Sequence, residues 1–106
     1  MFARTVRINL KTIGDPGYSR TLDEETLPAL RKFPGFVGQV SMMSSDGKEV
    51  IGISLWERRE DAEEYNRKGA ASVLKTLEKH MKGEPKVQTY EVTNSTLAAL
   101  PVRKAA

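Results

Sequence analysis

Residues 52–65, GISLWERREDAEEY, run from an apolar segment through the only tryptophan of the chain into a charged segment, with no turn residue between the two parts. The apolar part is rich in the β-branched and aromatic residues that favour strands. The charged part has acidic residues in its first turns, as expected for the positive end of a helix dipole. The helical segment that starts here ends in basic residues, Lys79, His80 and Lys82. We therefore predict a strand over 49–56 and a helix from about Arg58, with a break at Gly69.

Three further segments show the alternation typical of strands, and they cover residues 2–11, 36–43 and 86–93. After a turn at 14–17, Thr21-Leu22-Asp23-Glu24 has the pattern of a capping box, so a helix is expected to begin there, with Pro28 kinking it. Asp46-Gly47 favours a tight primed hairpin turn. The order βαββαβ predicts an α+β fold of the ferredoxin-like split type, a four-stranded antiparallel sheet with two helices on one face.

The composition excludes several kinds of site. The chain has no cysteine and one histidine, so it has no disulfide and too few ligands for a Cys/His zinc site, and we expect no metal. Its 106 residues fit one domain, and its net charge of +3 comes from 17 basic and 14 acidic residues that are interspersed along the chain. We therefore expect a cytoplasmic protein with no nucleic acid and no membrane as partner, since no long apolar stretch is present.

Both faces of the central strands carry apolar side chains, with Phe36, Val40 and Met42 on one parity of the second strand and Val37 and Met43 on the other. Helices on one side leave the opposite face open, and a second copy of the chain is the simplest cover for it. We predict a homodimer through the sheet face. Residues 1–94 form the domain, and residues 95–106 are a C-terminal tail that, if ordered, crosses the dimer edge as an arm.

Pro34-Gly35-Phe36 after the first helix, and Ile53-Ser54-Leu55-Trp56 before an acidic helix that reaches Tyr65, give the chain a family resemblance. Over about residues 2–94 it resembles the antibiotic biosynthesis monooxygenase (ABM)-like domains of the dimeric α+β barrel superfamily. The resemblance implies a homodimer whose two sheets close into a barrel, with a small cavity between sheet and helices in each subunit. Members of that family include cofactor-independent oxygenases of phenolic or quinol-like compounds, haem-degrading oxygenases, and proteins without known activity. The resemblance therefore leaves these three possibilities for this chain.

Five residues are candidates for a site, and each has a structural alternative. Trp56 is a stacking wall for a planar small aromatic ligand or a core anchor. Tyr65 offers a hydroxyl to a phenolic oxygen or only fills the core. His80 is a base or ligand, or a satisfied histidine near a helix end. Asn9, by the resemblance, holds a substrate oxygen or a haem-bound oxygen, but its parity opposes the apolar row of its strand, and the alternative is a solvated or interface asparagine. Arg7 shares that face, where it binds an anion or is solvated.

The resemblance also tests haem, because the haem-degrading branch has a tryptophan and a histidine about ten residues apart on the second helix. Alignment on Leu55-Trp56 places Tyr65 and Lys75 at those two positions, and neither matches. His80 is rotated away on an ideal helix, and only a break at Gly69 restores its phase. We therefore expect no cofactor and disfavour haem. The leading hypothesis is an ABM-type monooxygenase of a small phenolic or quinol-like compound, and the alternative is a non-catalytic small-ligand-binding dimer.

Overall fold

The computed structural model describes residues 1–96, and these form a four-stranded antiparallel sheet in the order β2-β3-β1-β4. The strands are β1 (Phe2–Asn9), β2 (Phe36–Met43), β3 (Glu49–Trp56) and β4 (Lys86–Glu91). The predicted fold class is confirmed, and β2 and β3 have the predicted bounds, while β1 and β4 end two residues earlier than predicted. Leu10 makes only an isolated bridge to Met81. Residues 97–106, which hold most of the predicted tail, lie outside the described part.

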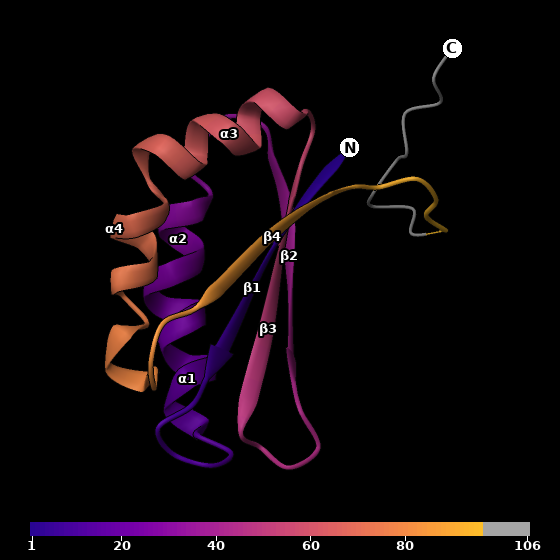
Figure 1. Ribbon diagram of the computed structural model, residues 1–106. Coiled ribbons are helices and arrows are strands. Elements are labelled where there is room, and N and C mark those ends of the chain that lie inside the picture. Colours follow the sequence, from indigo (N-terminus) through magenta and orange to yellow (C-terminus); the bar gives the residue numbers. More distant parts are fainter. Residues whose placement is uncertain (97–106) are drawn as a thin grey trace.

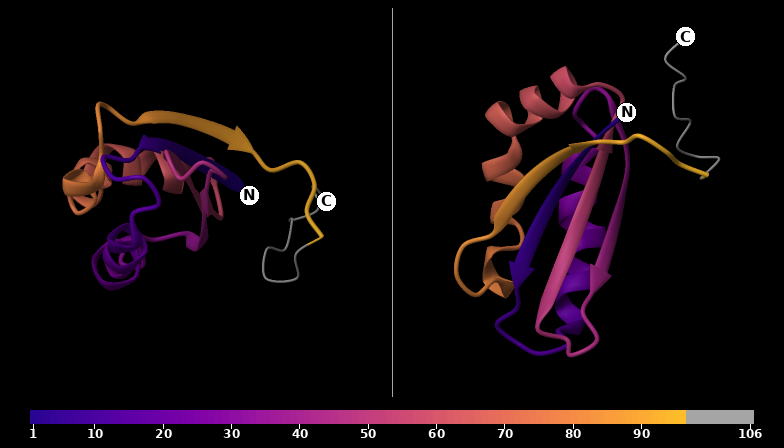
Figure 2. Two further views of the ribbon diagram at one scale, coloured as in Figure 1. Left: turned by 90° about the horizontal axis from the view of Figure 1, so that it is seen from below. Right: turned by 45° about the vertical axis from the view of Figure 1, so that its right-hand side comes forward.

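The helices lie on one face of this sheet (Figure 1). They are α1 (Pro16–Thr21), a π-helical turn (Leu22–Thr26), α2 (Leu27–Leu30), α3 (Arg59–Lys68), α4 (Ala70–Lys75) and a 3₁₀ turn (Glu78–His80). Figure 2 shows the same arrangement from two other directions, with no described helix on the opposite face of the sheet. The predicted break at Gly69 is confirmed, since this residue separates α3 from α4.

Trp56 is the centre of the larger core cluster and is fully buried. It ends β3, where it pairs with Phe2 of β1 and Phe36 of β2, so its ring lies under the first turns of α3. Tyr65 stacks on it, with ring centroids 4.9 Å apart. A second cluster lies at the other end of the sheet, around Ile8, Val50 and Leu77. The two clusters leave space between them in the middle of the layer.

The first helix begins earlier than predicted. Asp15 is its N-cap, and its carboxylate accepts a hydrogen bond of 2.8 Å from the Gly17 N–H, while Pro16 occupies the first helical position. A fixed φ and a missing N–H make proline well suited to that position, so the Asp-Pro pair starts a helix here instead of a turn. The predicted capping box at Thr21 is therefore wrong, because Thr21 lies inside the helical run and makes no capping bond.

The residues around Pro28 show the expected interruption in another form. Pro28 has no N–H to donate to the carbonyl four residues earlier, which breaks the regular ladder. The preceding turn is π-helical, and the Leu27 N–H bonds to the Leu22 carbonyl. The irregularity thus falls just before the proline, at the part of the helix that faces the middle of the sheet.

Two features of β2 differ from the prediction. The Ser44 N–H donates to the Glu49 carbonyl and closes the hairpin, and within the turn between these two residues only Gly47 has a positive φ, of 71°. A primed turn needs a positive φ at the first central residue, so the predicted tight primed turn is wrong.

A bulge between Phe36 and Gly38 also breaks the strict alternation of β2. Phe36 therefore faces the helices together with Gln39, and does not share a face with Val40 and Met42, as strict alternation predicted.

Candidate functional site

A cavity of about 50 Å³ lies between the sheet and the helices, in the space between the two core clusters. That volume is several times the roughly 10–15 Å³ that one water needs, and below the roughly 150 Å³ of a cavity known to accept benzene. Aliphatic side chains from β1, α2 and α4 form most of its wall. Polar groups enter it from six residues, Arg4, Tyr18, Thr26, Gln39, Ser54 and Tyr65. An apolar lining with a few converging polar groups is typical of small-ligand sites, but pockets for drug-sized ligands measure roughly 300–1,000 Å³, so this cavity is small for one.

Arg4 contributes the only formal charge to this lining among residues 1–96. It is 6% exposed, since it lies on the helix-facing side of β1 with Phe2 and Ile8. Its Nε and Nη2 atoms both donate to the Asn66 side-chain oxygen, at 3.3 and 3.1 Å. Its guanidinium carbon lies 5.3 Å from the centre of the Tyr65 ring. Burial lowers the pKa of Arg4, and the nearby Tyr65 hydroxyl offsets part of that effect.

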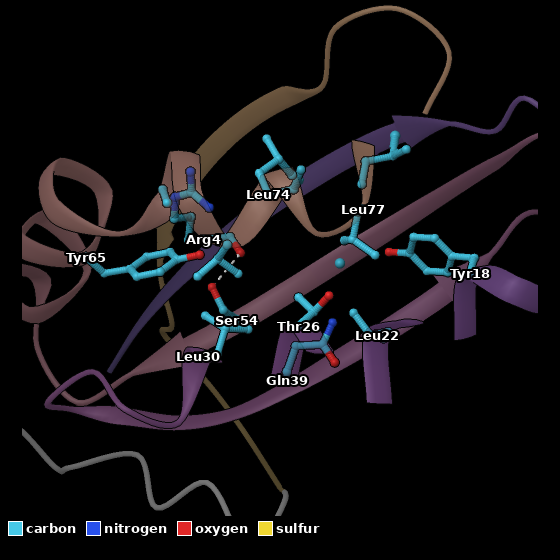
Figure 3. Close-up of a pocket in the computed structure, with 15 residues that line it drawn as sticks. Arg4, Tyr18, Leu22, Thr26, Leu30, Gln39, Ser54, Tyr65, Leu74 and Leu77 are labelled. Atoms are coloured by element: carbon cyan, nitrogen blue, oxygen red, sulfur yellow. Dashed lines mark hydrogen bonds between the residues drawn. The ribbon is translucent and has the colours of Figure 1, made fainter. Parts of the chain in front are cut away.

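Tyr65 and Tyr18 enter the cavity from opposite ends with their hydroxyl groups pointing toward each other (Figure 3). Each residue is 3% exposed. Burial raises the pKa of both hydroxyls, and Arg4 offsets part of the rise for Tyr65. Both phenols are therefore neutral at physiological pH, where they act as hydrogen-bond donors and not as bases.

Trp56 lies behind Tyr65 and does not line the cavity. Its indole N–H donates to the Ser54 hydroxyl at 3.0 Å, and the Ser54 hydroxyl donates to the Arg4 carbonyl at 3.3 Å. Phe36 packs against the indole edge-on, at 5.5 Å between ring centroids. Trp56 thus holds the Tyr65 ring in place on the side away from the cavity. Its position corresponds to the core anchor, the second of the two roles considered for it.

His80 lies outside the cavity, in the 3₁₀ turn beside the start of α1. Its Nδ1 is 2.7 Å from the Asp15 carboxylate and its Nε2 is 2.9 Å from the Thr21 hydroxyl. Carboxylate, imidazole and hydroxyl in this order resemble a hydrolytic triad, but Thr21 is buried inside a helical run, where no substrate carbonyl can approach it. The cluster ties the end of the second helical segment to the start of the first.

A haem does not fit these residues. Both ring nitrogens of His80 have partners, and the cavity is far smaller than a porphyrin and lacks a histidine. Among residues 1–96, no group of three or more His, Asp or Glu side chains is arranged to hold a metal ion.

Asn9 and Arg7 lie on the open face of the sheet, opposite the cavity, and both are exposed. A hollow of about 570 Å³ on that face is lined by Arg7 and by side chains of all four strands. Neither residue reaches Tyr65. Of the five predicted site residues, only Tyr65 lines the cavity, and Trp56 supports it.

Sequence reasoning missed Arg4 and Tyr18. Arg4 has a signal in the sequence, because it is the one charged residue in the apolar row of its strand, with Phe2, Val6 and Ile8 as neighbours on that face. Tyr18 lies between the turn predicted at 14–17 and the helix predicted from Thr21, so no helix face was considered for it. Their side chains meet Tyr65 only through the packing of the helices on the sheet.

The fold is that of the ABM-like monooxygenases. The monooxygenase from the gene ActVA-Orf6 of Streptomyces coelicolor, solved in complex with nanaomycin D, superposes with a TM-score of 0.73 at 18% identity, over 91% of this chain and 90% of that one. SnoaB of Streptomyces nogalater, a cofactor-independent oxygenase, superposes with a TM-score of 0.70 at 11% identity, over 90% of this chain and 95% of that one. Rv0793 of Mycobacterium tuberculosis superposes with a TM-score of 0.67 at 14% identity, over 91% of this chain and 98% of that one. No family model and no curated protein matches the sequence.

Proposed function

We propose that the protein is an ABM-type monooxygenase that acts on a small phenolic or quinol-like compound without a metal cofactor. The observation that carries this proposal is the cavity itself, in which the neutral hydroxyls of Tyr18 and Tyr65 point toward each other within aliphatic walls, with Arg4 beside Tyr65. At about 50 Å³ in the free protein, the cavity has to widen to admit an aromatic ring. Its shared fold with monooxygenases, one of which is described as cofactor-independent, supports the same class. Tyr65 is the candidate catalytic residue, as a donor to a substrate oxygen, and Trp56 positions its ring.

The reaction needs no external reductant when the substrate supplies all the electrons. A methylene group activated by a neighbouring phenol reacts as R₂CH₂ + O₂ → R₂CO + H₂O, so one oxygen atom becomes the carbonyl and the other leaves as water. The deprotonated substrate gives electrons directly to O₂. The protein binds the ring, donates hydrogen bonds to the developing oxyanion and excludes water.

A homodimer through the open sheet face belongs to the same proposal. Val40, Met42 and Tyr90 are 43%, 48% and 50% exposed on or beside that face, an unusual display of large apolar side chains. We expect Met42→Glu to reduce the molar mass in light scattering from that of a dimer to that of a monomer. Ile13→Glu, at an apolar residue 66% exposed in a loop, is the matched control and should leave the mass unchanged. A wild-type monomer refutes this interface.

A non-catalytic small-ligand-binding dimer is the second candidate. The observation that favours it is the lining, which among residues 1–96 contains no carboxylate or imidazole to act as a general base. Such a protein binds a planar compound in the same cavity without consuming oxygen.

Oxygen uptake separates the two candidates. Purified protein treated with a chelator is mixed with anthrone, 1-naphthol or 1,5-dihydroxynaphthalene under ¹⁸O₂, and product mass is measured together with O₂ consumption. A monooxygenase consumes one O₂ per product and places one ¹⁸O atom in it, and Tyr65→Phe slows the reaction. Saturable binding without oxygen uptake supports the binding protein and refutes the enzyme.

A further inference from the structure

A π-helical turn forms part of the cavity wall. The turn, Leu22–Thr26, joins α1 to α2, and the Leu27 N–H bonds to the Leu22 carbonyl five residues earlier. Leu22 and Thr26 line the cavity, and both are buried. Such turns are rare and occur frequently at functional sites, where a helix holds one residue more than its regular hydrogen-bond ladder needs. The wall therefore carries an extra residue at the cavity.

The helical segments on either side of the turn are held in place. On the side of α1, the Thr21 hydroxyl lies 2.9 Å from Nε2 of His80, and Asp15 binds Nδ1 of the same ring. On the side of α2, Leu30 belongs to the core cluster around Trp56. Because both ends are fixed, a movement of this wall is expected to be confined to the turn between them.

The π-helical form and the regular form of this turn are close in energy, because Pro28 follows it. A proline has no N–H to donate to the carbonyl four residues earlier, so the regular α-helical register also lacks one bond here. The π-helical form is therefore less unfavourable than it would be in an uninterrupted helix. Shifts of helix register take place within microseconds to milliseconds, which is fast enough to admit a ligand.

Among residues 1–96, two polar side-chain contacts join the turn to the second helical segment. The Thr26 hydroxyl lies 2.8 Å from that of Thr76, which itself donates to the Val73 carbonyl, so Thr26 is the donor between the two threonines. Glu25 and Lys79 form an ion pair of 3.7 Å, but both side chains are more than half exposed, and such pairs contribute little. The hydrogen bond of Thr26 is thus the main polar contact that holds the turn against α4.

We propose that the π-helical turn is the part of the wall that moves when the cavity widens. In the open form Thr26 separates from Thr76 and the turn moves away from the sheet, so that Leu22 and Thr26 withdraw from the cavity while α1 and α2 keep their places. This inference rests on the proposed function in taking the same cavity as the site of an aromatic compound, and it supplies the widening that a volume of about 50 Å³ requires. Opening precedes binding, so it is measurable in the free protein.

A thiol placed in the cavity reports the opening, because the chain has no cysteine of its own. Val73→Cys introduces the thiol at a lining residue of α4 that is 6% exposed. The probe is 4,4′-dithiodipyridine, a neutral aromatic disulfide. The thiolate attacks one sulfur to form a mixed disulfide, and the other half leaves as 4-thiopyridone, which carries the proton and is followed by its absorbance. The labelling rate therefore measures how often the cavity admits an aromatic ring.

Three changes in the Val73→Cys background test the turn. Thr26→Val keeps the branched shape and removes the bond to Thr76, and it should raise the labelling rate by about two- to tenfold, as the loss of one hydrogen bond predicts. Deletion of Glu24, an exposed residue of the turn, removes the extra residue and should slow labelling. Thr89→Val, at an exposed threonine of β4 whose side chain makes no hydrogen bond in the described chain, is the matched control and should leave the rate unchanged. If the deletion does not fold, the two threonine variants decide the test.

Urea separates opening of the turn from unfolding of the whole domain. Opening of one turn exposes little surface, so labelling by this route should depend only weakly on urea, whereas labelling through unfolding follows the steep urea dependence of unfolding itself. Hydrogen exchange read by mass spectrometry locates the movement, and the amides of residues 22–27 should exchange faster than those of residues 73–77. An equal labelling rate with and without Thr26→Val, the urea dependence of full unfolding, or faster exchange at 73–77 overturns the inference.

Labelling requires neither a substrate nor oxygen, so its result is independent of the oxygenase result. Opening through the turn without oxygen uptake refutes the monooxygenase and leaves this inference standing. Oxygen uptake together with a labelling rate that Thr26→Val does not change refutes this inference and leaves the monooxygenase standing.

Discussion

Arg4→Met should make the protein more stable. The desolvation of a buried cation costs several kcal/mol. Against this, Arg4 has a shared hydrogen bond to the Asn66 amide oxygen, worth about 1.5–3 kcal/mol for a charged donor, and a contact with the Tyr65 ring, worth about 0.5–1 kcal/mol. Methionine keeps an unbranched chain of similar length and its own contact with the ring. Asn66 is exposed, so its amide returns to water without penalty.

The balance gives an expected gain of about 1–2 kcal/mol in the free energy of unfolding, comparable to the roughly 1–4 kcal/mol seen when buried ion pairs are replaced by apolar side chains. For a domain of this size that corresponds to a rise of roughly 5–10 °C in Tm. The assay is urea unfolding followed by the fluorescence of Trp56, the only tryptophan, which stacks on Tyr65. Arg20→Gln, which removes an exposed charge of α1, is the control. Wild type and both variants are compared at one protein concentration, because dimer formation makes stability depend on concentration.

A loss of about 1 kcal/mol or more in Arg4→Met, with Arg20→Gln unchanged, refutes this reasoning. It would mean that the guanidinium stabilises the protein as a structural part of the core.

Three other outcomes are expected. Gly69→Ala should lower the free energy of unfolding by about 1–3 kcal/mol, because an added Cβ overlaps the Phe33 ring; unchanged urea unfolding contradicts this. The hydrogen bond from His80 holds the pKa of Asp15 below its usual value. The stability that Asp15 contributes is therefore present above its unfolded pKa of about 4 and is lost as pH falls through the lower folded pKa. Asp15→Asn should flatten the acid side of the curve of unfolding free energy against pH, and a slope as steep as that of the wild type contradicts this prediction. Tyr65→Phe should slow oxygen uptake about tenfold or more while urea unfolding changes little, and an equal rate removes the hydroxyl from the mechanism.

The sheet could be predicted from sequence because its signals are local. β3 and the start of α3 adjoin without a turn residue, and the acidic first turns agree with the helix at that position. Gly69 marked the break for the same reason, since glycine inside a helical segment is costly unless something requires it. The close approach of Phe33 is that requirement.

The beginning of the first helix was not predictable in the same way. Asp15-Pro16 is compatible with a turn and with an N-cap before the first helical residue, and the choice between them depends on the packing of the residues after Pro16. Tyr18 is buried against the sheet from this first turn, and its burial favours the helix.

The cavity depends on side chains that meet only after folding. Arg4, Tyr18 and Tyr65 come from three elements, and their separations in sequence contain no motif. Alternation along β1 predicts Asn9 and Arg7 on the face opposite Val6 and Ile8, and both lie there, on the open face of the sheet. The resemblance that suggested Asn9 carried no information about its direction.

The bulge in β2 has a consequence for insertions and deletions. Val37 and Gly38 together stand opposite Leu55, so the strand holds one residue more than its partner requires. A chain shortened by Val37 keeps every other pair with β3 and leaves each side chain on its present face. Removal of one residue after Gln39 has the opposite effect, since it moves the residues beyond it to the other side of the sheet. Natural variation in the length of this strand is therefore expected to concentrate at position 37.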